Sequence, residues 1–358
     1  PVTAGSEAYV MADSNLWGTT WEPSEINSDN FGIVITKYNN TDSVYIDHIR
    51  VTVYYWAWDS TNIAGANSPD TAYNGSDWNN AFSGLPAFNR PSGNGDQWTE
   101  EENPADGLIG PGDTVFVAGG VYTTDWEPGA SGKPAKPIVI IRATAEKHGT
   151  DIGWDPAFDS QVILDGVSIV IWGVNENDGF DYLTIDGQVW EGIKVDKSDG
   201  ESGHLIDLSP SNRYPSNYIT IKYVEAEGPG RNSGIDNTAC FRSTPVAASP
   251  PEHTGITVQY CHFHDVATAL MKLQCCNSFL LEYSEIHGTE DETLHEDYLI
   301  TYYSNNGMGR YNIFYDTESE GVYFENDCSN WYIYDLSLIH ISEPTRPLYI
   351  SYAVFCLK

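Results

Sequence analysis

The sequence predicts an all-β solenoid, in which the chain winds into stacked coils of short parallel strands. The first observation is a tyrosine that recurs down the second half of the chain, after an alternating apolar segment and before a second apolar position. The second is that the pattern extends to a glycine upstream and an aspartate downstream, at intervals of 36, 37, 23, 28 and 24 residues. The positions are Gly187, Tyr223, Tyr260, Tyr283, Tyr311 and Asp335. A repeat near 23 residues with insertions fits one coil per repeat with loops at fixed corners.

The first element along the chain is a separate unit over residues 1–57. Its segments SEAYVMA, FGIVITKY and YIDHIRVTVYYW alternate in the way that strands do. The stretch LWGTTWEPSEINSDNFGIVI, with the later VYIDHIRVTVYYWA, resembles the end of a β-sandwich module found in phage-like and cell-surface proteins. We therefore expect a partial antiparallel β-sandwich fragment, followed by a linker over residues 58–67.

The solenoid itself is expected over residues 68–335. The segment SDWNNAFSGLPAF predicts a short amphipathic helix with Ser76 or Asp77 as its cap. GDTVFVAGGVYTT, residues 112–124, then predicts the first clear coil. This combination resembles the start of right-handed parallel β-helices of the pectate-lyase-like superfamily. The resemblance implies a right-handed parallel β-helix whose open end is covered by the helix, which protects bare strand edges.

Later segments continue the coils and interrupt them. PIVIIRAT, QVILDG and SIVIWG read as further strands, and residues 196–215 and 227–252 are expected to be loops on one side of the helix. Residues 336–358 do not continue the pattern. LSLIHISEPTR and ISYAVFCL resemble, in the right order, the translation of a DNA sequencing adapter. We expect Leu336 onward to be read-through from a metagenomic fragment, so that the native protein is truncated there.

Composition favours an extracellular location or a cell or virion surface. The 17 basic residues stand against 51 acidic ones, for a net charge of −34. A field of that sign repels nucleic acid and anionic membranes and suits cation binding or solubility. No apolar run approaches the ~18 residues of a membrane span. The five cysteines before the tail lack CxxC spacing, which predicts neither a metal knuckle nor a disulfide framework.

Stacking turns equivalent residues of each repeat into columns. The column three residues past the tyrosine position is expected to be core, with Trp190, Ala226, Phe263, Ile286 and Phe314. The column one residue past it resembles the corner where β-helices stack asparagines, although only Asn312 fits. Lys222 and Arg310 lie one residue before the tyrosine position. They resemble the Lys or Arg base of β-helix polysaccharide lyases and are candidate substrate-binding residues. The alternative is a surface ion pair between Glu282 and Arg310.

Two outward columns carry the strongest candidate chemistry. Two and four residues past the tyrosine position lie carboxylates and imidazoles: Glu225, Glu227, His262, His264, Glu285 and His287. Alternation puts both members of each pair on one face, and successive coils are ~4.8 Å apart. The result is a two-by-three patch on one outer sheet. Neighbouring carboxylates raise the pKa of imidazoles, which makes His262, His264, Glu285 and His287 candidates for catalysis near neutral pH. The alternative is a hydrated, charged outer face.

Metal binding is a second use of such a patch. An acidic loop, TEDETLHED, follows the patch in the sequence. Carboxylates with loop carbonyls bind calcium, and carboxylates with imidazoles bind transition metals. The candidate calcium ligands are Glu225, Glu227, Asp291, Glu296 and Asp297. Lys272 lies between the His262 and Glu285 coils in the sequence, and it is the candidate base if its side chain faces the patch.

The sequence therefore predicts a polysaccharide-active β-helix protein. We expect it to cleave a uronate-containing glycan by β-elimination with calcium, or by hydrolysis between two carboxylates. The catalytic motifs of polygalacturonase-type enzymes and the vWiDH motif of the major pectate lyases are absent. One alternative is a phage tailspike-like or cell-surface adhesion protein that binds glycan without cleaving it, as a homotrimer in the tailspike case. Another is a purely structural solenoid.

Overall fold

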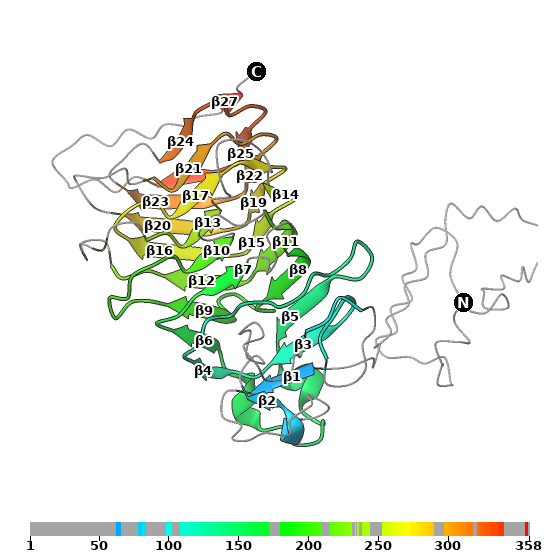
Figure 1. The fold of residues 1–358 in the computed structure, drawn as a ribbon. Helices are drawn as coiled ribbons and strands as arrows, with labels where there is room; N and C mark the ends of the chain where they lie inside the picture. The colour runs from blue at the N-terminus through cyan, green and yellow to red at the C-terminus, as the bar shows by residue number, and fades with distance from the viewer. Residues whose placement is uncertain are drawn as a thin grey trace, which may run out of the picture. The chain divides into compact units, whose positions relative to one another are not determined.

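The computed structural model confirms the parallel β-helix. It describes residues 62–65, 78–83, 98–101, 108–171, 180–208, 215–230, 233, 235, 238–243, 253–289, 297–317, 321–339 and 355–356. The β-sandwich fragment expected over residues 1–57 lies outside the described residues. Within the described part, successive coils place their strands in three parallel sheets, and Figure 1 shows these sheets rising coil upon coil from β4 to β24. Parallel strands joined by crossovers of this kind wind right-handed.

The first sheet is the longest. Its strands pair in parallel except for the last, which is antiparallel. In spatial order they are β2 (Phe82–Ser83), β1 (Asn62–Gly65), β3 (Thr114–Val117), β5 (Ile138–Arg142), β8 (Asp181–Asp186), β11 (Asn217–Lys222), β15 (Thr257–Gln259), β19 (Leu280–Glu282), β22 (Met308–Arg310), β25 (Tyr332–Tyr334) and β27 (Phe355–Cys356).

The second and third sheets complete each coil. The second contains β4 (Gly120–Tyr122), β6 (Val162–Asp165), β9 (Ile193–Asp196), β12 (Val224–Glu227), β16 (His262–Val266), β20 (Glu285–Thr289), β23 (Ile313–Thr317) and β26 (Ser337–Ile339). The third contains β7 (Ile169–Ile171), β10 (Ile206–Leu208), β13 (Phe241–Ser243), β17 (Met271–Gln274), β21 (Leu299–Tyr302) and β24 (Val322–Glu325). A short pair, β14 (His253–Thr254) with β18 (Cys276–Asn277), lies apart from them.

The core is a set of inward columns of aliphatic side chains. In the first sheet, Ile140, Ile185, Ile221, Val258 and Leu281 lie opposite one another on successive strands and are all buried. Inward positions alternate with partly exposed ones, because successive side chains of a strand point to opposite faces. Burial of this continuous apolar column is the main force that stabilises one coil on the next.

The recurrent tyrosines form the corner between the first and second sheets. Each one directly follows a strand of the first sheet and stands one or two residues before the next strand, and all four adopt a left-handed backbone conformation with φ between 53° and 57°. Their rings stack at centroid distances of 4.9, 5.0 and 5.1 Å. The predicted tyrosine column, Tyr223 to Tyr311, is therefore confirmed. A non-glycine residue in this conformation costs about 1–2 kcal/mol, which ring stacking offsets.

Several element predictions were wrong. The expected helix at the N-terminal end is a single 3-10 turn, η1 (Trp78–Asn80), followed by β2. Within the linker expected over residues 58–67, Asn62–Gly65 form β1, which pairs with β3, and the domain boundaries themselves stay predictions. The two expected loops contain β10 and β13, because each coil needs a third strand to close. The remaining helices are short: α2 (Ala145–His148) and η2 (Pro156–Asp159).

Two further expectations concern the tail and membranes. Residues Ser337–Ile339 form β26, which pairs with β23, and the assignment of residues 336–358 to adapter read-through stays a prediction. Among the described residues, no helix has the length and apolar character needed to span a bilayer.

Candidate Glu–His active site

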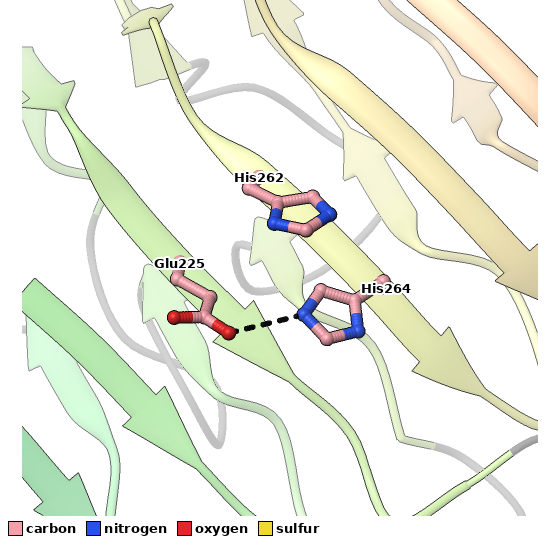
Figure 2. Close-up of side chains that lie close together, drawn as sticks. All are labelled: Glu225, His262 and His264. Carbon is pink, nitrogen blue, oxygen red and sulfur yellow. Dashed lines mark hydrogen bonds and ion pairs between the residues drawn. The ribbon is translucent and has the colours of Figure 1, made fainter. Parts of the chain in front are cut away.

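Strand register brings the six predicted residues of the second sheet together. Glu225 on β12 lies opposite His262 on β16, and Glu227 lies opposite His264. The same two histidines lie opposite Glu285 and His287 on β20. We call these six residues the Glu–His patch. Figure 2 shows Glu225, His262 and His264 on neighbouring strands with their polar ends directed toward one another.

Both columns continue beyond the patch. On β9, Lys194 lies opposite Glu225 and Asp196 lies opposite Glu227. On β23, Tyr315 lies opposite His287. The sequence prediction missed these three residues. Tyr315 was predictable, because it lies four residues past Tyr311 and so belongs to the column that already held His264.

His264 is held by carboxylates on both sides of its ring. Its Nδ1 lies 2.9 Å from Asp265 and its Nε2 lies 3.3 Å from Glu225. Burial opposes protonation of this side chain, but the hydrogen bonds to Asp265 and Glu225 outweigh burial and raise the pKa of His264 to about 9. The ring therefore carries both protons at neutral pH and donates one to each carboxylate.

Lys194 neutralises the other carboxylates at the lower end of the patch. Its Nζ lies 3.0 Å from Asp196 and 3.7 Å from Glu225, and it also pairs with Glu227. Burial favours the neutral amine, but these carboxylates outweigh it and raise the pKa of Lys194. Burial likewise opposes ionisation of Glu225, yet His264 and Lys194 hold its pKa below the ordinary value.

His262 connects the patch to an exposed turn. Its Nδ1 lies 2.7 Å from the Glu191 carboxylate, and its Nε2 lies 2.9 Å from Nε2 of His287. The Trp190 indole stacks on the His262 ring at 5.9 Å. Trp190 was predicted to be core, but 44% of it is exposed. Val195 takes the core position instead, because it is the residue that lies opposite Ala226.

His287 and Glu285 form the upper end of the patch. The His287 ring stacks on Tyr315 at 4.3 Å. Burial, together with the neighbouring His264 and His262, lowers the pKa of His287 to about 4, so this imidazole is neutral. The Tyr315 hydroxyl donates to Oε1 of Glu285 at 2.6 Å. Burial and this carboxylate raise the pKa of Tyr315, which keeps its proton on the phenol.

The patch contains groups of nitrogen and oxygen donors close enough to share one ion. Within each group, one donor atom per residue lies within 4.8 Å of the others. The groups are Glu225, His262 and His264; His262, Glu285 and His287; and Glu227, His264 and Asp265. The same atoms are also suited to move protons, since they include imidazoles in both protonation states beside a phenol.

The other predicted site residues lie elsewhere. Lys272 is on β17 of the third sheet, opposite Arg242 and Ile300, and not in the sheet of the Glu–His patch. Lys272 therefore lies outside the Glu–His patch, and its role as a base stays a prediction. A residue that lies between two tyrosine positions in the sequence can belong to any of the three sheets. The tyrosine spacing alone does not show which sheet contains it.

Lys222 and Arg310 lie in the first sheet as parts of ion pairs. Lys222 pairs with Asp186 at 2.9 Å, and Arg310 pairs with Glu282 at 2.6 Å. Arg310 also donates to the Tyr334 hydroxyl. The alternative considered for the sequence, an ion pair between Glu282 and Arg310 on successive coils, is what the structure contains.

Of the predicted calcium ligands, Glu225 and Glu227 lie together on β12, but the described residues contain no donor group that joins them to each other or to Asp297. Glu225 and Glu227 contact Lys194. Asp297 is fully buried just before β21, where its carbonyl accepts from the backbone of Leu270. Asp291 and Glu296 lie outside the described residues.

Comparison with known proteins identifies no family. No family model matches the chain, and no curated protein matches it.

Solved structures match with low similarity. The GH136 lacto-N-biosidase from Eubacterium ramulus is 12% identical, with 79% of this chain and 56% of that chain covered and a TM-score of 0.43. A mannuronic acid specific polysaccharide family 6 lyase from human gut microbiota is 13% identical, with coverage of 64% and 61% and a TM-score of 0.32. ORF18 of Geobacillus virus E2 is 10% identical, with coverage of 68% and 56% and a TM-score of 0.28. The chain thus spans a little over half of the lacto-N-biosidase.

Proposed function

We propose that this protein cleaves a uronate-containing polysaccharide at the Glu–His patch by β-elimination. The observation that carries the proposal is the register of β12, β16 and β20. It gathers three imidazoles, carboxylates and the Tyr315 hydroxyl on one outward face. We place the activity outside the cell or at a cell or virion surface, where a net charge of −34 keeps the protein soluble.

β-Elimination needs groups that this patch contains. A proton is removed from the carbon next to the uronate carboxylate, and the electrons of that C–H bond form a carbon–carbon double bond. The glycosidic C–O bond breaks, and its electron pair leaves on the oxygen, which takes up a proton. A proton acceptor and a proton donor must therefore lie on either side of one sugar. In one column, the neutral imidazole of His287 can accept a proton, and the doubly protonated His264 and the Tyr315 hydroxyl, which lie on either side of it, can donate one. We assign proton transfer to this column.

Sugar binding beside the column has a candidate in Trp190. This indole is half exposed and lies over His262, where it offers an aromatic face to a sugar ring. The tyrosine column is unsuited to that task despite its exposed edge. Its rings stack on one another at about 5 Å, so neighbouring tyrosines cover the faces on which a sugar would stack.

The test is product analysis on a panel of uronate polysaccharides, namely polymannuronate, polyguluronate, polygalacturonate and polyglucuronate. We expect a product with the ultraviolet absorbance of an unsaturated uronate from at least one of them. New reducing ends without that absorbance would indicate hydrolysis and overturn elimination. Retention on an immobilised glycan without any product would favour the adhesion alternative and overturn cleavage.

Variants locate the activity on the patch. His264→Gln and Tyr315→Phe each remove a proton carrier, and we expect each to lower kcat by about 10²–10⁴-fold, the usual contribution of general acid–base catalysis. Thr257→Ala is the matched control, because Thr257 lies in the same coil as His264 but in the first sheet. Equal losses in all three variants would contradict the assignment.

A further inference from the structure

We infer that His262, His287 and Glu285 form a transition-metal site with two histidine ligands and one carboxylate ligand. The three residues lie on β16 and β20, which pair directly. Their donor atoms lie within 4.8 Å of one another. The lower half of the patch, in contrast, is occupied by ion pairs and hydrogen bonds among its own side chains.

The distance between the two imidazoles suits a shared ion. Nε2 of His262 and Nε2 of His287 are 2.9 Å apart. Two histidine nitrogens bound to one metal at about 2.0–2.1 Å, with an angle between a right angle and a tetrahedral one, lie about 2.9–3.4 Å apart. The observed separation therefore needs no large rearrangement of either strand for both nitrogens to bind the same ion.

The outer contacts of the three ligands orient them toward a common point. Glu191 lies 2.7 Å from Nδ1 of His262, which places a proton on Nδ1 and directs the Nε2 lone pair at Nε2 of His287, where an ion would replace the shared proton. Tyr315 donates to Oε1 of Glu285, which leaves Oε2 as a donor. Carboxylates and hydroxyls behind the ligands are the usual supports of protein metal sites, where they fix the tautomer and the direction of each ligand.

The remaining groups of the patch are committed to other contacts. Both ring nitrogens of His264 contact carboxylates, those of Asp265 and Glu225. Lys194 in turn pairs with Glu225 and Glu227. These contacts neutralise the lower half of the patch without an added ion, whereas no lysine or arginine among the described residues pairs with His262, Glu285 or His287.

The donor set also selects the class of metal. Two imidazole nitrogens with one carboxylate suit zinc, iron, copper or nickel, whereas calcium and magnesium take oxygen ligands. We therefore assign this site to a divalent transition metal and not to the calcium that the sequence suggested. Three protein ligands leave further coordination positions open, as in catalytic metal sites.

A role in cleavage rests on the proposed function, whereas metal binding does not. A bound divalent cation would neutralise the carboxylate of a uronate and make the adjacent carbon more acidic. It would also take His262, His287 and Glu285 as ligands, so His264 and Tyr315 would remain as proton donors, and the Glu225 carboxylate beside His264 would be the acceptor in place of His287.

The test is calorimetric titration of the chelator-stripped full-length chain with zinc chloride alone, followed by the absorption spectrum of the cobalt-loaded protein. We expect one equivalent of zinc to bind, and a cobalt spectrum without the charge-transfer band of a thiolate ligand.

Glu285→Gln and His287→Ala should abolish binding. Glu191→Gln should weaken it by about 10–100-fold, the usual effect of removing a supporting group. Glu146→Gln, on the exposed surface of α2, is the matched control and should bind as the wild type does.

Several outcomes would overturn the site. They are no stoichiometric zinc binding by the wild type, equal binding by the Glu285→Gln variant, and displacement of zinc by an equal concentration of calcium. Where His287→Ala does not fold, as judged by circular dichroism, Glu285→Gln and Glu191→Gln decide the question. Zinc binding without cleavage of any uronate polysaccharide would support the metal site and contradict the proposed function alone.

Discussion

A single residue at each corner determines how one sheet passes into the next. Tyr223, Tyr260, Tyr283 and Tyr311 all adopt positive φ, a conformation that glycine adopts most easily. The chain nevertheless uses tyrosine, and each ring stacks on its neighbour at close to 5 Å. Stacking between coils thus compensates for backbone strain within a coil.

Substitution of Tyr260 separates these two contributions. Tyr260→Ala keeps the strained backbone and loses two stacked neighbours, so we expect it to lower the free energy of unfolding by about 1–3 kcal/mol. Tyr260→Gly loses the same stacking but relieves the strain, and we expect it to be about 1 kcal/mol more stable than the alanine variant. Chemical denaturation measures both. Greater stability of the alanine variant would contradict the strain argument.

Buried histidines outside the patch make the fold sensitive to acid. His253 is fully buried, and its Nδ1 accepts from the backbone N–H of Ser216 at 3.1 Å. Burial lowers its pKa from 6.5 to about 4. Burial, with nearby cationic side chains, likewise lowers the pKa of His204 to about 3. Both imidazoles therefore stay neutral in the folded protein while the unfolded chain takes up protons.

The sign of the pH effect follows from this difference. His253 contributes its full stability above pH 6.5, and that stability is lost as the pH falls toward 4, because only the unfolded state binds the proton in this range. The loss for one such histidine is on the order of 3 kcal/mol. Thermal unfolding across this range should show a shallower decline for His253→Asn, whose amide does not titrate. Identical slopes for the variant and the wild type would contradict this explanation.

At the scale of a strand, alternation divides β16 between core and site. Phe263 is fully buried and stacks on Phe241 of the third sheet at 6.5 Å, while His262 and His264 on either side point outward. The rigidity of the patch thus depends on the packing of the residue between its two histidines.

Truncation of Phe263 tests that dependence. We expect Phe263→Ala to lower the free energy of unfolding by about 3–5 kcal/mol, as for other large residues removed from a core. The outward Thr257→Ala in the same coil should change it by less than about 1 kcal/mol. Denaturant titration of both variants measures the difference. Similar small effects would mean that β16 does not have the register described.

The elements that the sequence predicted well are those without insertions. In the coils of Tyr223, Tyr260 and Tyr283, the strand of the second sheet begins one or two residues after the tyrosine, so counting from the tyrosine places the predicted side chains on the correct face. In the Gly187 coil the strand β9 begins only at Ile193. The chain turns tightly between them, and a Cβ at Gly192 would lie 1.9 Å from the Gly187 carbonyl oxygen.

That turn explains what the sequence could not show. It moves Trp190 and Glu191 out of the expected columns and over His262, and it brings Lys194 into the column of Glu225. Apolar periodicity does not reveal the length of such a turn, because the residues within it contact the site through side chains and not through strand pairing. Two strands of the third sheet, β10 and β13, were harder still to predict, since they lie inside segments that are rich in loop-forming residues.

At the scale of the whole molecule, the sheets separate structural charges from the candidate site. The charged side chains Lys222 and Arg310 of the first sheet are paired with Asp186 and Glu282. In the third sheet, Arg242 is paired with Asp207 at 2.7 Å. Only the second sheet, among the described residues, gathers three histidines with carboxylates across consecutive coils. This concentration of groups on one face makes it the centre of the proposed activity.

The most direct test of that claim compares one coil at two of its faces. The measurement is the initial rate of unsaturated product formation from the uronate polysaccharide that the wild type cleaves best. His264→Gln, on the second sheet, should lower this rate by at least about 10²-fold. Thr257→Ala, on the first sheet of the same coil, should leave it within about twofold of the wild-type rate. Full activity of His264→Gln, or an equal loss in Thr257→Ala, would contradict the location of the active centre on the Glu–His patch.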